Sequence, residues 1–167
     1  GTGTLPKHWH ESGGFGTSIQ GGLGGTVYKV TNLNNSGPGS FRDAVTGNNR
    51  LVVFTVGGVI DLNDSDIDLG SNVTIAGQTA PYPGITTIKG NIKMFGSNNV
   101  VSHITHHLGS EVDSYPDAWN VFGNNIVLDH VAVYWGKDET LPVMGATNVT
   151  IYKCIIAEGL QFCGHGD

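Results

Sequence analysis

The sequence predicts an all-β fold, a parallel β-helix in which the chain winds as a solenoid. Short β-branched runs that open with asparagine begin at Asn72, Asn99, Asn125 and Asn148, and these asparagines are 27, 26 and 23 residues apart. A fainter copy begins at Asn49, 23 residues before Asn72. The connections between the runs are rich in Gly, Asn and Ser, and no unit has ten residues with apolar side chains at helical spacing. A repeat of this length without helical periodicity is typical of a solenoid built from strands.

Equivalent strands of successive coils should stack in parallel and align their side chains in columns. Alignment on the four asparagines predicts two inward columns, which are Val73, Val100, Ile126 and Val149 and then Ile75, Ser102, Leu128 and Ile151. Asparagine suits the corners because it tolerates a left-handed backbone and its amide can bond the asparagine of the next coil. A β-sandwich with accidental repeats is the alternative, and antiparallel pairing of 126–128 with 149–151 would indicate it.

The whole chain, residues 1–167, is expected to form one β-helix domain. Residues 1–25 read as an irregular glycine-rich segment, 26–50 as the first strand and a cap, and 51–167 as the coils. The glycine run lacks the Lys-Ser/Thr ending of a phosphate loop and precedes a strand, which argues against a nucleotide site. The first strand is predicted at 27–30. Two further strands joined by Gly57 and Gly58 are predicted between Leu51 and Leu62.

A short N-terminal capping helix is predicted to start after Ser40. Ser40 and Asp43 have the spacing of a capping box, with Asp in place of Glu. The helix should extend to about Thr46 and place Phe41, Ala44 and Val45 on one face. Because the exposed end of a solenoid must be covered, we expect this helix to lie over the first coil.

Composition excludes several classes of protein. The net charge is −6, and the eight Lys and Arg residues form no basic run, so nucleic-acid binding is not expected. No apolar segment approaches eighteen residues, so no membrane span is expected. With no signal peptide, the sequence is that expected of a mature secreted protein. Cys154 and Cys163 either form a disulfide or are two buried thiols, and the sequence leaves both open.

Several motifs together resemble the pectate lyase superfamily of family 1 polysaccharide lyases. They are Gly13-Gly-Phe-Gly, Tyr28-Lys-Val-Thr-Asn-Leu-Asn, Gly37-Pro-Gly-Ser-Phe-Arg, Val73-Thr-Ile-Ala-Gly-Gln-Thr-Ala-Pro, Asp129-His130 and Trp135-Gly-Lys-Asp-Glu-Thr-Leu. The resemblance covers the N-terminal part of such a protein, since typical members continue for several more coils. It implies a right-handed parallel β-helix, an extracellular location, and calcium-assisted β-elimination of an acidic polysaccharide such as polygalacturonate.

β-Elimination removes a weakly acidic proton beside a uronate carboxylate, so a site needs several carboxylates and a base. Acidic residues concentrate in the last coils, at Glu111, Asp113, Asp117, Asp129, Asp138, Glu139 and Glu158. The resemblance implies calcium ligands at Asp117 and Asp138, and Glu139 adjoins them as a third metal candidate. The alternative is that these acids are simply solvated on corner loops.

The catalytic base is not identified. The two arginines, Arg42 and Arg50, lie in the cap region, and the resemblance implies that the family's catalytic arginine lies on later coils. Lys137 is a weak candidate for the base and a candidate for substrate binding, together with His107. This chain alone is therefore expected to be a poor lyase.

The remaining candidate residues have structural interpretations. Asp129 and His130 are interpreted as a hydrogen-bonded pair that closes a strand, and Cys154 and Cys163 as structural cysteines. His103, His106, His107 and His130 would bind zinc or copper if they converged. However, His103 and His130 have equivalent positions in successive coils, so stacking explains them without a metal.

A second class of function stays open. A β-helix has unpaired strand groups at each open end, and we expect the last coil to pair with further coils or with another copy of the chain. Head-to-tail stacking of copies would give a filament. The chain would then be a non-catalytic extracellular solenoid with a structural or carbohydrate-binding role.

Overall fold

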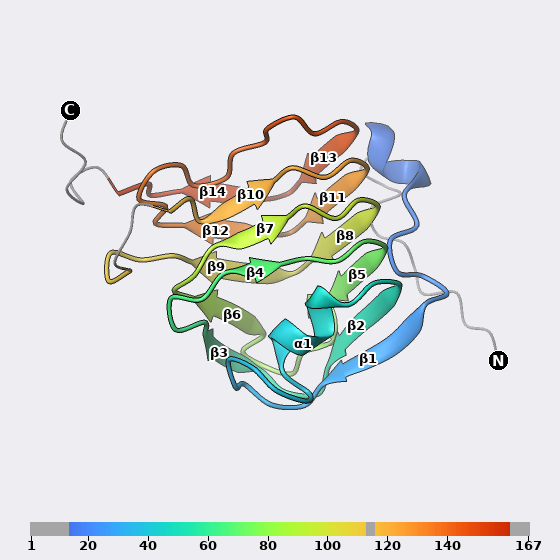
Figure 1. Cartoon of the computed structure of the whole chain (residues 1–167), viewed down its shortest axis with the longest axis horizontal. Helices are drawn as coiled ribbons and strands as arrows, with labels where there is room; N and C mark the ends of the chain where they lie inside the picture. Colours follow the sequence, from blue (N-terminus) through green and yellow to red (C-terminus); the bar gives the residue numbers. More distant parts are fainter. Residues whose placement is uncertain (1–13, 113–115, 161–167) are drawn as a thin grey trace.

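The computed structural model describes residues 14–112 and 116–160, and it is a parallel β-solenoid of about five turns. Each coil contributes one strand to each of up to three sheets, so the sheets run side by side along the solenoid (Figure 1). Every strand pairing in the described residues is parallel, which confirms the predicted fold class and excludes the sandwich.

Sheet A is the longest of the three. In the order of pairing it consists of β1 (Thr26–Val30), β2 (Arg50–Phe54), β5 (Val73–Ala76), β8 (Asn99–Ser102), β11 (Ile126–Asp129) and β13 (Val149–Tyr152). Its strands carry the β-branched runs of the repeat, because side chains branched at Cβ pack well on a pleated surface.

Sheets B and C complete the coils. Sheet B consists of β3 (Gly58–Asp61), β6 (Ile85–Ile88), β9 (Ile104–His107), β12 (Ala132–Tyr134) and β14 (Ile155–Ala157). Sheet C consists of β4 (Ile67–Asp68), β7 (Ile92–Met94) and β10 (Trp119–Val121). The chain passes from A to B through one to three residues, except between β5 and β6, where eight residues include the 3-10 helix η3 (Gly77–Thr79). It passes from B to C through loops of unequal length.

The corner before sheet A is built from the repeated asparagines. Asn49, Asn72, Asn98, Asn125 and Asn148 all have φ between 55° and 58°. Side-chain amides bond from coil to coil, from Asn72 to Asn49 (2.9 Å), from Asn98 to Asn72 (2.7 Å) and from Asn148 to Asn125 (2.9 Å). The predicted asparagine corner is therefore confirmed, including its left-handed backbone.

The predicted register was wrong by one residue at β8. Val100 pairs with Thr74 and Val127 and belongs to the outward column, while the inward column is Ile75, Val101, Leu128 and Ile151. The error arose because two asparagines are adjacent: Asn98, not Asn99, is the corner residue. Asn99 is instead buried, and its side-chain oxygen accepts a hydrogen bond from the backbone N–H of Val73 (2.8 Å).

The capping helix α1 (Phe41–Thr46) follows its prediction closely. The Ser40 side chain accepts a hydrogen bond from the backbone N–H of Asp43 (3.2 Å), and Phe41, Ala44 and Val45 are fully buried. The helix contacts β1, β2 and β4, so it covers the interior at the first coils. The predicted strands at 27–30 and between Leu51 and Leu62 are also confirmed, as β1, β2 and β3.

The glycine-rich segment lies across the outer face of sheet A, and we call residues 14–25 the strap. It begins with the short 3-10 helix η2 (Gly14–Ser18) beside β13 and then passes the other strands on its way to β1 (Figure 1). The N–H of Gly16 donates to Thr150 (3.0 Å), and that of Gly22 donates to Thr74 (2.9 Å). A Cβ at Gly22 would collide with the carbonyl oxygen of Arg50, so close approach explains the glycine run.

The interior is apolar and continuous from the capping helix to the last described coils. Its largest fully buried side chains include Trp119, Phe41, Ile75, Ile126 and Leu128. No helix in residues 14–112 or 116–160 is long and apolar enough to cross a membrane.

Candidate functional site

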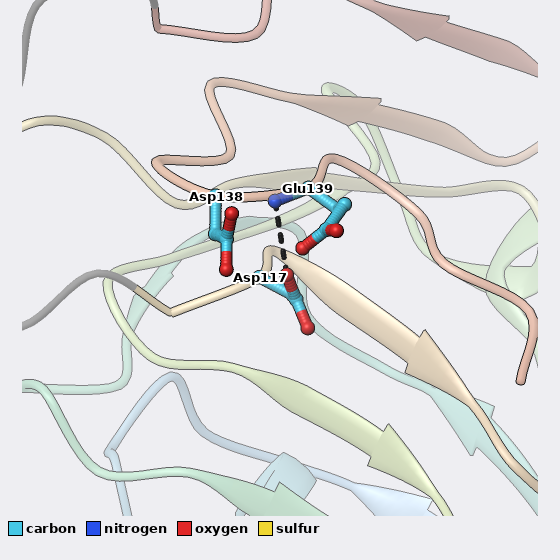
Figure 2. A group of neighbouring side chains, drawn as sticks. All are labelled: Asp117, Asp138 and Glu139. Carbon is cyan, nitrogen blue, oxygen red and sulfur yellow. Dashed lines mark hydrogen bonds between the residues drawn. The ribbon is translucent and has the colours of Figure 1, made fainter. Parts of the chain in front are cut away.

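The three candidate metal residues come together at one edge of the solenoid. Asp117 precedes β10, while Asp138 and Glu139 lie on the loop that follows β12. One carboxylate oxygen from each lies within 4.8 Å of the other two, and Figure 2 shows the three side chains converging. We call Asp117, Asp138 and Glu139 the acidic cluster. Among the described residues, it is the group whose ligand atoms are arranged to hold a metal ion.

Backbone pairing between coils brings these residues together. The N–H of Glu139 donates to a carboxylate oxygen of Asp117 (2.9 Å), the dashed line in Figure 2. The N–H of Ala118 donates to the carbonyl of Glu139 (3.0 Å), and that of Trp119 to the carbonyl of Thr140 (3.2 Å). The solenoid repeat therefore places acids that are 21 and 22 residues apart side by side.

The cluster concentrates negative charge. A side-chain hydrogen bond with Asp117, followed by repulsion from Asp117 and Asp138, raises the pKa of Glu139 to about 7. Glu139 is fully exposed, so the shift reflects its charged neighbours far more than burial. A divalent cation would relieve this repulsion, which makes the arrangement suitable for one.

A polar network behind the cluster was not predicted. The Asn120 amide donates to Asp117, and the Asn91 amide donates to Asn120. The N–H of Asn91 donates to Asp66 (3.0 Å), whose other oxygen bonds Lys93 (2.6 Å). Asn91 and Asn120 are 97% buried, so they link the position of Asp117 to the two preceding coils. The sequence signal for this network is a polar residue next to or within each strand of sheet C, namely Asp66, Asn91 and Asn120.

The two candidate substrate residues lie in different surroundings. Lys137 adjoins the acidic cluster in sequence, and its ammonium group donates to the carbonyl of Val112 (2.8 Å). His107 is on the outer face of sheet B, where its ring contacts Tyr134 and Trp135. Lys137 therefore lies on the loop of the acidic cluster, and His107 contacts Trp135 at the start of the same loop.

The histidines lie in different places. His106 is fully buried, bonds Thr87 (2.9 Å) and packs edge-on to Trp119, and desolvation lowers its pKa to about 3. His103 and His130 stack with ring centroids 4.7 Å apart, as predicted for equivalent positions. Stacked rings of this kind present their faces to each other rather than converging ring nitrogens.

The structural candidates have identifiable contacts. A ring nitrogen of His130 lies 2.6 Å from a carboxylate oxygen of the buried Asp129, which is the predicted pairing. The sulfur of Cys154 is half-buried against backbone groups of Leu128, Val131 and Tyr152, and burial raises the pKa of its thiol. Cys163 and Asp113 lie outside the described residues.

The other acids and both arginines have separate partners. Glu111 pairs with Lys89 (3.1 Å), and Glu158 accepts a hydrogen bond from the indole of Trp135 (2.9 Å). Arg42 bonds backbone carbonyls of Ser65 and Asp66, and Arg50 bonds those of Asp43 and Ala44. Both arginines therefore hold the region around the capping helix, as predicted from their sequence positions.

Sequence comparison finds close relatives among fungal proteins. The "Probable pectate lyase C" of Aspergillus terreus (strain NIH 2624 / FGSC A1156) is 47% identical over 152 residues, which are 89% of this chain and 36% of that protein. The proteins of the same name from Aspergillus fumigatus and Emericella nidulans match with the same identity and coverage. The chain thus spans about a third of the length of the curated relatives it matches. No family model matches the sequence.

Structural comparison supports the fold. The crystal structure of jun a 1, the major allergen from cedar pollen, matches with a TM-score of 0.63 at 22% identity. The match covers 83% of this chain and 46% of that chain. At this level of identity, the match shows a shared β-helix fold.

Proposed function

Because this chain belongs to the pectate lyase family, we propose that it is the calcium-holding part of a secreted lyase that acts on acidic polysaccharide of the polygalacturonate type. The reaction is β-elimination, and the observation that carries the proposal is the convergence of Asp117, Asp138 and Glu139. An extracellular location is proposed with it, because a polymer of this size does not cross a membrane.

The acidic cluster fits calcium. Calcium takes about six to eight oxygen ligands in flexible geometry, and three carboxylates supply up to six. The pKa of Glu139 is raised first by its side-chain hydrogen bond with Asp117 and then by repulsion from Asp117 and Asp138, and a bound dication would oppose that repulsion. Asp117 is held on two sides, by the N–H of Glu139 and the amide of Asn120, so a ligand set would be partly formed in advance.

Bound calcium would withdraw electron density from a uronate carboxylate and so acidify the proton on the neighbouring carbon. The residues of this chain then have binding and orienting roles. Asp117, Asp138 and Glu139 would hold the ion, and Asn120 with Asn91 fixes the position of Asp117. We propose that Lys137 binds an anionic group of the substrate, because its side chain is cationic, has three N–H donors, and lies on the same loop as Asp138 and Glu139.

The chain by itself is proposed to be a poor lyase. The two arginines are engaged at the capping helix, and the Lys137 ammonium group donates a hydrogen bond to the carbonyl of Val112, whereas a base must accept a proton. Incubation with polygalacturonate and calcium should give little ultraviolet absorbance from unsaturated uronates. Strong absorbance that disappears in a Lys137→Ala variant would assign the base to Lys137 instead.

The central experiment is calcium calorimetry on this chain. Asp138→Asn should abolish or greatly weaken binding, since it removes one charge from the cluster. Asp64→Asn is the matched control, because it makes the same chemical change at an exposed acid on the loop between β3 and β4. Absence of calcium binding at millimolar concentration, or equal binding by both variants, would contradict the proposal.

The same samples test the alternative of a non-catalytic solenoid. If copies stack end to end, light scattering should rise steeply with protein concentration, and the filament should be visible by electron microscopy. Scattering that grows with concentration without any calcium binding would favour the structural role over the lyase.

A further inference from the structure

The outer face of sheet B carries an aromatic surface that the acidic cluster does not use. Thr105 and His107 of β9 lie in register with Ala132 and Tyr134 of β12, and all four are only partly buried. Trp135 follows Tyr134 at the corner, and Glu158 lies in the next coil. We call Thr105, His107, Ala132, Tyr134, Trp135 and Glu158 the aromatic face; together they line a hollow of about 350 Å³.

A second hollow lies against the same two rings. It measures about 390 Å³ and is lined by His107 and Trp135 together with Ile88, Lys89, Leu108 and Glu111 among others. Both volumes fall in the range of roughly 300–1,000 Å³ that is usual for small-molecule sites. A ligand therefore finds concave surface on both sides of the His107–Trp135 pair.

The tryptophan ring is held in place although it is partly open to solvent. The Trp135 side chain is 37% exposed, and its indole N–H donates to Glu158 (2.9 Å). Its ring centroid lies 4.6 Å from that of His107, which in turn meets Tyr134 edge-on at 5.0 Å. The backbone of Trp135 is left-handed (φ 60°), as it is at Lys89 and Glu158, which follow strands of the same sheet in other coils.

The charges around the face do not suit an anion. Lys89 lies between Glu111 (3.1 Å) and Asp61 (3.5 Å), so its charge is more than matched by two acids. Glu158 adds a further negative charge beside the tryptophan. Burial lowers the pKa of His107, which disfavours the charged imidazolium. A uronate would be repelled here, whereas a neutral ligand would not.

We propose that the aromatic face binds a neutral hexose unit of a polysaccharide. A hexose ring has an apolar C–H surface and a rim of hydroxyl groups, and fixed aromatic rings beside polar acceptors complement both. The ring of the sugar lies on Trp135 and His107. Its hydroxyls bond the Glu158 carboxylate, which has lone pairs beyond the one used by the indole, and the Thr105 hydroxyl. This binding requires neither calcium nor elimination, and so goes beyond the proposed function.

The test is calorimetry in EDTA with three probes. Two are neutral tetrasaccharides, a β-1,4-linked galactan fragment and a β-1,4-linked glucan fragment, and the third is trigalacturonate. At least one neutral probe should bind, and trigalacturonate should bind more weakly or not at all. Removal of calcium separates this result from the acidic cluster, so failure here and failure of the proposed function are distinguishable.

Two variants locate the binding. Trp135→Asn should weaken the neutral probe at least about tenfold, as expected for a central aromatic anchor, and Asn tolerates the left-handed backbone. Glu158→Gln keeps the size of the side chain and should weaken binding about fivefold. Phe95→Ala is the control, because Phe95 is an exposed aromatic residue (57%) after β7 of sheet C. Thermal unfolding of each variant confirms that it is folded.

Three results would overturn the proposal. The first is that neither neutral probe binds at millimolar concentration. The second is that trigalacturonate binds better than both neutral probes in EDTA. The third is that folded Trp135→Asn and Glu158→Gln variants bind as the parent does, or that Phe95→Ala loses as much affinity as they do.

Discussion

The corner before sheet A and the corner after sheet B differ although both use left-handed backbone. Before sheet A, five successive coils place asparagine at the turn. After sheet B, the left-handed positions include Lys89, Trp135 and Glu158, and the loops that follow differ in length from coil to coil. The first corner is uniform, whereas the second is not.

The corner before sheet A stabilises the fold, whereas the corner after sheet B carries the candidate functional residues. A repeated asparagine gains a partner in the next coil, so each amide is used for stacking. Unlike side chains form no repeated ladder of this kind, although Trp135 donates to Glu158 of the next coil, and the loops after sheet B carry the acids and aromatic rings. The acidic cluster and the aromatic face both border the loop that begins at Trp135, at the non-uniform corner.

The largest expected effect is on the free energy of unfolding, for a substitution in sheet A beyond the uniform corner. Leu128→Ala removes a fully buried side chain stacked between Val101 and Ile151, and should cost about 2–5 kcal/mol of unfolding free energy. Lys137→Ala, on the non-uniform loop, should cost only about 1 kcal/mol, since it loses one hydrogen bond to Val112. Urea denaturation measures both. Equal losses would break the distinction between the two regions.

The uniform corner itself depends on backbone conformation as well as on amide bonding. Asn98→Val places a β-branched residue at φ 58° and should be less stable than Asn98→Gly by about 1–3 kcal/mol. The glycine variant loses the 2.7 Å bond to Asn72 but keeps the backbone relaxed. If the two variants unfold at the same urea concentration, the amide ladder and not the left-handed turn determines stability.

The free energy of unfolding should decrease in acid because His106 is buried beneath sheet B. His106 has a folded-state pKa of about 3, below the value of roughly 6.5 in an unfolded chain. Between these values only the unfolded state takes up the proton. The contribution of His106 to the free energy of unfolding is therefore fully present above about pH 6.5 and is lost as the pH decreases. The slope contributed by this group is at most about 1.4 kcal/mol per pH unit.

The measurement is urea denaturation from pH 7 to pH 4 on the parent and on His106→Phe, which keeps an aromatic ring against Trp119. The parent should lose more stability over this range than the variant. Parallel curves would mean that His106 does not resist protonation in the folded chain.

The smallest expected effect is the release of a proton from Glu139 when calcium binds the acidic cluster. With a pKa of about 7, Glu139 holds roughly half a proton at neutral pH, and bound calcium should displace it. Calcium binding should therefore strengthen from pH 6 to pH 8. Calorimetry in two buffers of different ionisation enthalpy detects the released proton, and Glu139→Gln should remove the buffer dependence. A heat that is identical in both buffers would contradict the shared proton.

Much of the fold was predictable because it is local or periodic. The capping box at Ser40, the parallel stack and the asparagine corner all follow from short-range patterns. The register of β8 could not be predicted from such patterns. Asn98 and Asn99 are both asparagine, and only their packing shows which of them is at the corner. The strap was missed because its partners, such as Thr150 for Gly16, lie far away in the sequence.

The acidic cluster was partly predictable. The resemblance to a family placed Asp117 and Asp138, and the repeat explains why they meet. The buried Asn91 and Asn120 were missed because a polar residue in an apolar strand has no pattern of its own until its partner is known.

The strap sets an order of events during synthesis. Gly16 is made early, yet its hydrogen-bond partner Thr150 emerges from the ribosome 134 residues later. Until β11 and β13 have formed, the strap cannot dock fully, and Val100 and Val127 on the outer face of sheet A remain without the Ile19 cover that they have in the folded chain. The strap thus docks after strands that follow it in the chain, and Val100 and Val127 stay exposed on the outer face of sheet A until it does.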